Sequence, residues 1–262
     1  MTGPHCDRPG AVVLGTRVTV ATFDGAQRLI AELVERRAGD FVSCANAFSL
    51  TMAHQDSAYR SLLNSASVVT ADGMSIVWAL RALGERVERV HNDDLLLACC
   101  RRYPAWRHFL LGGSPGQPEV VADELRRRFP GISIVGTHAT PRRPIREGET
   151  EAILDLIERS GADLVWVGMG TPPQDVWMAS VAARARAPMV GCGSLFDLLA
   201  GKTRPAPDWM KRHGLQWMFR LAQEPRRLAY RYANYNTRFV LAFSAQWLRH
   251  VLRGAARRTG PG

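Results

Sequence analysis

An aspartate that follows an apolar run is the first candidate for chemistry in this chain. Asp72 lies in the string Ala71–Asp72–Gly73, directly before a helical stretch. There it either caps that helix or stays exposed as a general base that takes a proton from an attacking hydroxyl. Asp93 and Asp94 also precede a helical stretch, and capping is the expectation for both. No Asp-x-Asp string occurs, so a paired-carboxylate Mg²⁺ or Mn²⁺ clamp on a diphosphate has no support.

Glycines and polar side chains follow several other apolar runs. The loops concerned hold Asn46, Gly112–Gly116 and Gly168–Gln174. Glycines let backbone N–H groups approach a phosphate, aided by the positive end of the next helix, but a structural turn is the simpler interpretation of each loop. No GxxxxGK[ST] string occurs and no complete dinucleotide fingerprint follows the first strand. These absences exclude a P-loop NTPase and disfavour a nicotinamide-dependent oxidoreductase.

The positive charge is concentrated at one end of the chain. Residues 202–262 carry 13 Lys and Arg against two acids, a net charge of +11, which leaves residues 1–201 at −1. Arg220, Arg226, Arg227 and Arg231 share one side of a helical stretch, and Arg forks bind phosphate oxygens in bidentate geometry. A solvated basic face is the alternative. The asymmetry indicates a polyanionic partner: nucleic acid, an anionic membrane surface or phosphates.

Composition excludes several classes of protein. The five cysteines show no zinc-ligand spacing, so neither a disulfide scaffold nor a structural zinc site is supported. The N-terminal residues lack the apolar stretch of a signal peptide. The longest apolar C-terminal stretch, residues 239–248, has ten residues, whereas a membrane-spanning helix needs about 20. We therefore expect a reduced protein on the cytoplasmic side. Its C-terminal aromatic residues either pack on the core or lie in a membrane interface.

Short apolar runs alternate with amphipathic stretches over residues 11–201. Such alternation predicts βαβ crossovers and a Rossmann-like, doubly wound, mostly parallel sheet. A helix over 24–37 is expected to be capped by Asp24, and one continuous helix is expected over 47–63. The other expected helices cover residues 74–83, 119–129, 149–160 and 175–185. The expected strands are Val18–Thr22, Phe41–Cys44, Ser67–Thr70, Arg107–Leu111, Ile132–Gly136, Leu164–Gly168 and Met189–Cys192.

A proline-containing segment at residues 203–208 interrupts this pattern. Residues 209–253 are then expected to be wholly helical, with a break at Glu224–Pro225. We therefore divide the chain into a Rossmann-like α/β catalytic core, 1–202, and a basic helical appendage, 203–262.

Six strings, in order and at similar spacing, resemble the WecG/TagA/CpsF glycosyltransferases, family 26. They are TADGMSIVWALRALG, ERVHNDDL, FLLGGSPG, DLVWVGMGTPPQDVW, GCGSLFDLLAGKTRPAPDWMKRHGLQW and RLAQEPRRLAYRY, at 70–84, 88–95, 109–116, 163–177, 191–217 and 220–232. The resemblance implies an inverting, metal-independent transfer from a UDP-sugar to a polyprenyl-diphosphate-linked saccharide at the cytoplasmic face of the membrane. It also implies that the appendage completes the active site and contacts the membrane.

The resemblance also assigns roles to residues. The aspartate of the ADG string is Asp72, the expected base, and Asn46 is the second expected catalytic residue. Gln174 is the glutamine of the G-x-P-x-Q-E signature. The basic residues of the appendage, Arg220, Arg227 and Arg231, are expected near the UDP diphosphate. The full set expected to bind substrate is Cys44, Asp94, Gly112, Gly170, Gln174, Arg220, Arg227 and Arg231.

The chain departs from the family pattern at several of these motifs. Cys44 stands where the family usually has Thr, and a thiol is the weaker hydrogen-bond donor. Asp175 replaces a Glu, and Pro173 replaces a common Lys. His91 and Asn92 replace Thr and Gly, and Tyr230 stands where Arg is common. These departures indicate a diverged donor or acceptor preference; an inactive relative is the other interpretation.

We therefore expect a UDP-sugar-dependent glycosyltransferase of cell-wall or exopolysaccharide biosynthesis, peripheral at the inner face of the cell membrane. The expected donors carry a hexose or N-acetylhexosamine, such as N-acetylmannosamine, its uronic acid or glucose. No metal or other cofactor is expected. A basic nucleic-acid-binding protein is the alternative from another class, but the basic helices carry no recognisable nucleic-acid motif. The sequence leaves open whether the chain forms a homo-oligomer.

Overall fold

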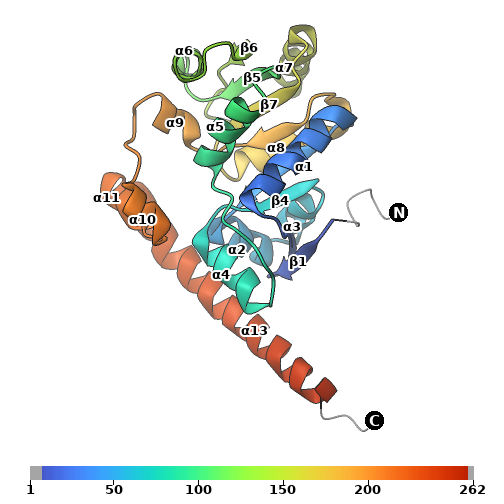
Figure 1. The fold of residues 1–262 in the computed structure, drawn as a ribbon, viewed down its shortest axis with the longest axis vertical. Coiled ribbons are helices and arrows are strands. Elements are labelled where there is room, and N and C mark those ends of the chain that lie inside the picture. Colours follow the sequence, from blue (N-terminus) through green and yellow to red (C-terminus); the bar gives the residue numbers. More distant parts are fainter. Residues whose placement is uncertain (1–7, 259–262) are drawn as a thin grey trace.

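A six-stranded, all-parallel sheet forms the centre of the computed structural model, which describes residues 8–258 without the side chains of 208, 212 and 254–258 (Figure 1). The strand order is β4-β3-β8-β7-β5-β6. The bounds are β3 Phe41–Ala45, β4 Val68–Ala71, β5 Arg107–Gly112, β6 Ser133–His138, β7 Leu164–Gly168 and β8 Met189–Gly191. The expected α/β, Rossmann-like architecture is confirmed. Part of the N-terminal segment considered above, residues 1–7, lies outside the described residues.

Apolar side chains cover both faces of this sheet. Strand residues alternate between faces, so Leu164 and Trp166 of β7 join one core cluster, while Val165 and Val167 join the other. Helices α1 Phe23–Arg36, α5 Asn92–Arg102, α6 Gln117–Arg128 and α9 Leu195–Leu199 pack on the first face. Helices α2 Ala47–Gln55, α3 Ser57–Asn64, α4 Met74–Ala82, α7 Glu147–Ser160 and α8 Pro173–Val181 pack on the second, and 3₁₀-helix η1 Ala182–Arg184 follows α8. Burial on both sides explains why the strands read as continuous apolar runs.

The first expected strand does not belong to the parallel sheet, which corrects the prediction for Val18–Thr22. Strand β2, Thr16–Thr19, pairs antiparallel with β1, Gly10–Val13, in a separate two-stranded sheet. Leu14 and Gly15 join them with φ of 52° and 85°. Positive φ at both residues of a two-residue loop matches the right-handed twist of a hairpin. The local turn geometry therefore pairs these residues with each other.

Three predictions about helix ends are also wrong. Thr22, not Asp24, caps α1, because the Thr22 hydroxyl accepts from the Gly25 N–H at 3.0 Å. The helix expected over 47–63 is two helices, since Asp56 is extended and caps α3 with its carboxylate. Asp93 and Asp94 lie inside the first turn of α5 and do not cap it. For α1 and α3 the polar side chain nearest the first free N–H groups decides where the helix begins, whereas α5 begins after His91 without a side-chain cap.

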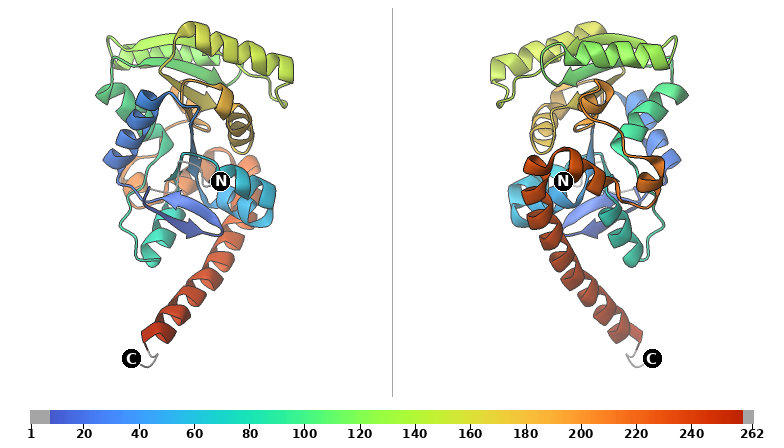
Figure 2. Two further views of the ribbon diagram at one scale, coloured as in Figure 1. Left: turned by 90° about the vertical axis from the view of Figure 1, so that its right-hand side faces the viewer. Right: turned by 90° about the vertical axis from the view of Figure 1, so that its left-hand side faces the viewer.

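The C-terminal residues are largely helical and break at Glu224–Pro225, as expected, but a second break at residues 213–215 corrects the expectation of a helix without interruption before Glu224. The elements are α10 Asp208–Arg212, α11 Gln216–Gln223, α12 Pro225–Arg231, the π-helix η2 Tyr232–Asn236 and α13 Thr237–Arg258. Helices α10 and α11 lie below α9 in Figure 1, whereas α13 contacts α2 and extends away from the body of the molecule (Figure 2). Gln246 and Trp247 tie its middle to the β1–β2 hairpin and to the Ala82 carbonyl at the end of α4.

Candidate functional site

The carboxyl ends of four adjacent strands open into one cavity of about 460 Å³. Ligands bind at this edge of open parallel sheets because the loops there precede helix N-termini. Asn46 follows β3, Asp72 follows β4, Gly170 follows β7, and Cys192 and Gly193 follow β8, and all line the cavity. The opposite wall comes from the C-terminal helices through Arg220, Arg227 and Arg231. Residues far apart in the sequence thus face one another across a single space.

Asp72 keeps part of its carboxylate open to this cavity. It does not cap α4, because that helix begins after Gly73 without a side-chain cap. Instead its Oδ1 accepts from the Asn92 N–H at 3.1 Å, and its backbone carbonyl accepts from Arg89 Nε at 2.8 Å. Burial raises the pKa of Asp72, opposed by the positive charge of Arg89 and the Asn92 hydrogen bond. A carboxylate whose pKa lies above its usual value is a stronger base.

Asn46 caps helix α2, and this leaves only part of its side chain free to bind a ligand. Its amide oxygen accepts from the N–H groups of Phe48 and Ser49 at 3.1 and 3.2 Å, and this caps α2. The oxygen is therefore occupied by the helix end. The amide nitrogen has no hydrogen-bond partner in the described part of the chain, so it is the atom that can donate to a ligand.

Three arginines give the facing wall its charge. Arg220 donates to Ser194 Oγ at 2.5 Å, Arg227 pairs with Glu224, and the Arg231 guanidinium lies 3.4 Å from the centre of the Phe48 ring. Burial is the main cause that lowers the pKa of Arg231, to about 10, with repulsion by the other two arginines adding to it. Arg231 is still charged at neutral pH. A cluster of like charges in one wall is stabilised when an anion such as a diphosphate binds there.

Gln174 and Asp175 lie behind the cavity and do not line it. Gln174 is buried, and its Oε1 accepts from the Gly193 N–H at 3.0 Å. A Cβ on Gly191 would lie 2.7 Å from the Gln174 amide nitrogen, so the glycine is needed for this close packing. Gln174 therefore positions the loop after β8. Asp175 is equally buried and accepts from Ser43 Oγ and Tyr59 OH, both at 2.8 Å.

Besides Gln174, two more residues expected at the site do not reach the cavity wall. Gly112 ends β5 with φ of 120°, and a Cβ there would lie 2.6 Å from the backbone of Gly168. Close packing of β5 against β7 therefore explains why a glycine stands at this position. Asp94 is about half exposed on α5, whereas its neighbour Asp93 lines the cavity. Cys44 does line the cavity, and burial raises the pKa of its thiol.

Arg89 is a residue that sequence reasoning did not assign. Besides holding the Asp72 carbonyl, it donates from its second terminal nitrogen to Gln216 Oε1 at 2.7 Å. It thus links the strand-end loop to α11 of the appendage. The only sequence signal for Arg89 was its position in the family-like string at 88–95. That stretch has no helical or strand periodicity from which the direction of the side chain could be predicted.

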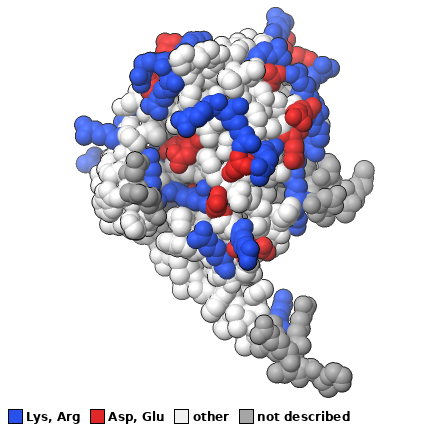
Figure 3. Space-filling view, in the orientation of Figure 1, with Lys and Arg blue, Asp and Glu red and all other residues white. Residues whose placement is uncertain are grey.

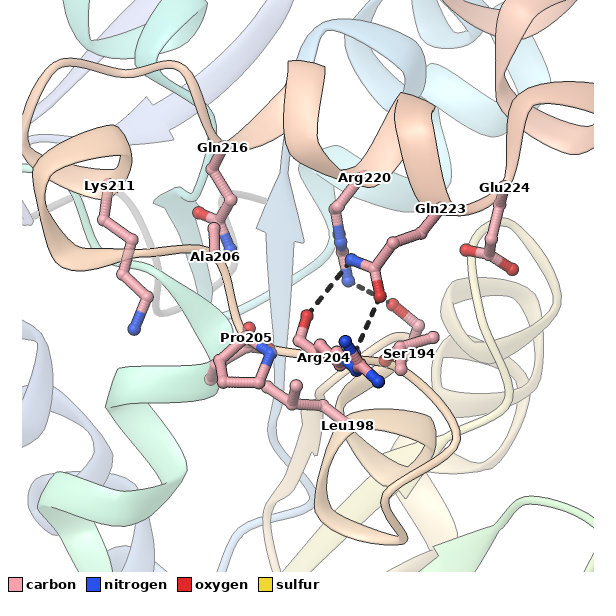
Figure 4. Close-up of a pocket in the computed structure, with 12 residues that line it drawn as sticks. Ser194, Leu198, Arg204, Pro205, Ala206, Lys211, Gln216, Arg220, Gln223 and Glu224 are labelled. Carbon is pink, nitrogen blue, oxygen red and sulfur yellow. Dashed lines mark hydrogen bonds between the residues drawn. The ribbon is translucent and has the colours of Figure 1, made fainter.

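A smaller cavity adjoins the first and shares Asp93, Ser194, Gln216 and Arg220 with it. Figure 4 shows Gln223 of α11 bonded to the backbone of Arg204, with Gln223 Oε1 accepting from the Arg204 N–H at 2.8 Å. The segment after residue 202 is thereby fixed against α11. Lys211 lines the same small cavity, so its wall is also basic.

The described residues hold neither a metal-ligand cluster nor a membrane-spanning helix. Within residues 8–258, no three His, Cys, Asp or Glu side chains gather as a metal site would require. In the same range, every helix is either too short or too polar to cross a membrane. Metal independence stays a prediction.

The family comparison covers the sheet, the cavity and most of the appendage. The family described as "Glycosyl transferase WecG/TagA/CpsF family" matches residues 11–253 of the 262. Its members are glycosyltransferases of cell-wall polysaccharide biosynthesis, so the protein is a transferase of sugars. A strand-edge cavity with a carboxylate on one wall and arginines on the other is consistent with that activity. The chain therefore belongs to the WecG/TagA/CpsF glycosyltransferase family.

Proposed function

We propose that this glycosyltransferase transfers a hexose or N-acetylhexosamine from a UDP-sugar to a polyprenyl-diphosphate-linked saccharide, with inversion. One observation carries the proposal: Asp72 and the three arginines line the same cavity from opposite walls. Inverting transfer needs a base on one side of the anomeric carbon and a stabilised leaving group on the other. The cavity offers both.

Each residue has a defined task in this reaction. Asp72 takes the proton of the acceptor hydroxyl, the hydroxyl oxygen bonds to the anomeric carbon, and the bond to UDP breaks on the opposite face. Arg220, Arg227 and Arg231 stabilise the charge that develops on the leaving diphosphate, which preorganised cations do efficiently. Asn46 Nδ2, Cys44 and Gly170 contact the substrates, and Gln174 acts through the loop it holds. Because the arginines supply the positive charge, we propose transfer without a metal ion.

The exposed surface of α13 supports contact with a membrane surface. Its outward face carries Leu241, Leu248 and Leu252, which are 66%, 54% and 59% exposed. The view in Figure 3 shows the part of α13 below the body as largely uncharged. An apolar helical surface with Arg249 and Arg253 nearby fits the interface of an anionic lipid layer better than a nucleic acid. A peripheral position at the inner face of the cell membrane would bring the lipid-linked acceptor to the cavity.

The proposal is tested by UDP release from a panel of UDP-sugars with a short-chain lipid-diphosphate acceptor. Asp72→Asn should lower kcat by about 10²–10⁴-fold, the usual contribution of a general base. Asp155→Asn is the matched control, because Asp155 lies on the exposed side of α7 in an ion pair with Arg159. Wild-type rate should be unchanged by EDTA. Near-wild-type turnover by folded Asp72→Asn would refute the base assignment, and no turnover with any UDP-sugar would refute the proposed donor class.

A further inference from the structure

His91 is a buried histidine whose ring has one nitrogen open to the cavity. The residue is 7% exposed and lines the cavity wall. Nδ1 is enclosed and without a hydrogen-bond partner; the carboxylate oxygens of Asp93 and Asp94 lie 3.6 and 3.8 Å away, beyond hydrogen-bond range. Nε2 has no partner among the described residues either, but it is not enclosed. The exposed part of the ring therefore includes Nε2.

The surroundings of His91 fix its charge and favour one tautomer. Burial lowers the pKa of His91 to about 4, against the opposing effect of Asp93, so the ring is neutral at neutral pH. A neutral imidazole has one N–H and one lone pair. Because two carboxylates face Nδ1, the proton is favoured there, which leaves the lone pair on Nε2. Nε2 is then a hydrogen-bond acceptor that the folded chain leaves unused.

His91 lies close to both the proposed base, Asp72, and a proposed leaving-group residue, Arg220. The next residue, Asn92, donates its N–H to Asp72 Oδ1 at 3.1 Å, so His91 lies beside the proposed base. Arg220, proposed to hold the leaving diphosphate, is close enough to lower the pKa of the His91 ring. In the proposed reaction the donor hexose must lie between Asp72 and Arg220. A hydroxyl of that hexose is thus the ligand group nearest to His91.

We propose that His91 is a specificity residue for the donor sugar, with Nε2 accepting a hydrogen bond from a hydroxyl of the hexose of a UDP-sugar. This inference rests on the proposed function and adds a contact to it. It concerns the sugar, not the nucleotide. Removing the acceptor should therefore weaken binding of the UDP-sugar and leave binding of UDP unchanged.

The test is calorimetric titration of the full-length protein with UDP, UDP-glucose and UDP-N-acetylglucosamine. In His91→Phe the better-bound of the two UDP-sugars should lose about five- to tenfold in affinity, as expected for one hydrogen bond, while the Kd of UDP stays the same. His91→Gln, which keeps an amide oxygen in reach, should restore most of the loss. His54→Phe is the control, since His54 is exposed at the end of α2.

A second arm varies the sugar and starts from wild-type protein. Among monodeoxy forms of the preferred UDP-sugar, one should bind wild-type protein about five- to tenfold more weakly; that difference should vanish in His91→Phe and largely persist in His91→Gln, which keeps an acceptor oxygen. Equal losses for UDP and the UDP-sugar in His91→Phe, or no monodeoxy form with a defect dependent on His91, would overturn the inference alone. Failure of wild-type protein to bind UDP or any UDP-sugar would overturn the proposed function together with it.

Discussion

Asp175 joins three elements behind the cavity through a buried carboxylate. It lies on α8, is 1% exposed, and accepts hydroxyl hydrogen bonds from Ser43 of β3 and Tyr59 of α3. Burial raises the pKa of Asp175 to about 6, although both hydrogen bonds lower it. The folded protein therefore disfavours the ionised form of this group. Replacing the carboxylate by a neutral amide, Asp175→Asn, should change stability in a way that depends on pH.

The magnitude follows from the two pKa values. The ordinary carboxyl pKa is 3.8 and the folded value is about 6, a difference of roughly two pH units. At 1.36 kcal/mol per unit this is about 3 kcal/mol. The folded state holds the extra proton between these values, so the contribution of Asp175 is present below pH 3.8 and is lost as pH rises through about 6. Asp175→Asn keeps a carbonyl oxygen for Ser43 or Tyr59 and has no charge to desolvate.

The assay is urea unfolding of wild type and Asp175→Asn, followed by tryptophan fluorescence from about pH 4 to about pH 8. The free energy of unfolding of the variant relative to wild type should rise by about 3 kcal/mol across this range. Comparison of the two proteins cancels the other titrating groups. Asp155→Asn, exposed on α7, should show no such rise. A difference that is independent of pH, or one that falls as pH rises, would refute the reasoning.

Two further predictions concern folding. Burial lowers the pKa of His108 from 6.5 to about 4, so the stabilising contribution of the neutral ring is present above pH 6.5 and is lost as pH falls through about 4. In urea unfolding, His108→Asn should remove about 3 kcal/mol of the loss of stability that wild type shows over this pH range. An unchanged dependence of stability on acid pH would contradict the assignment. Gly112→Ala would place a Cβ 2.6 Å from the Gly168 backbone. Gly116→Ala is the control, because Gly116 also has a positive φ, 78°, but has open space around it, so that this substitution adds only about 1 kcal/mol of backbone strain. Thermal melts should show the first variant less stable by at least about 2 kcal/mol than the second, and equal melting temperatures would contradict a packing role for Gly112.

The local sequence predicted much of the fold correctly because its signals are short-range. Apolar runs of the parallel strands, glycine and proline at the breaks, and the stop at Glu224–Pro225 all act over a few residues. Helix starts were predicted less well, since Thr22 and Asp56 compete with neighbouring polar residues for the same N–H groups. The hairpin of β1 and β2 was missed because its turn residues, Leu14 and Gly15, lack the usual Asn-Gly or Asp-Gly signature.

By itself the sequence determined that Asp72 and Asn46 follow strands of a parallel sheet and that Arg220, Arg227 and Arg231 lie in a helical stretch. The single helical side expected for these arginines is wrong, because Arg220 lies on α11 and the other two on α12. Only the tertiary structure decided which strand ends meet. The order β4-β3-β8-β7-β5-β6 brings the ends of the first four to the cavity and leaves Gly112, at the end of β5, outside it. Strand order depends on how helices pack over both faces, which no local pattern encodes. The same packing sets the rotation of α5, so that Asp93 lines the cavity while Asp94 faces outward.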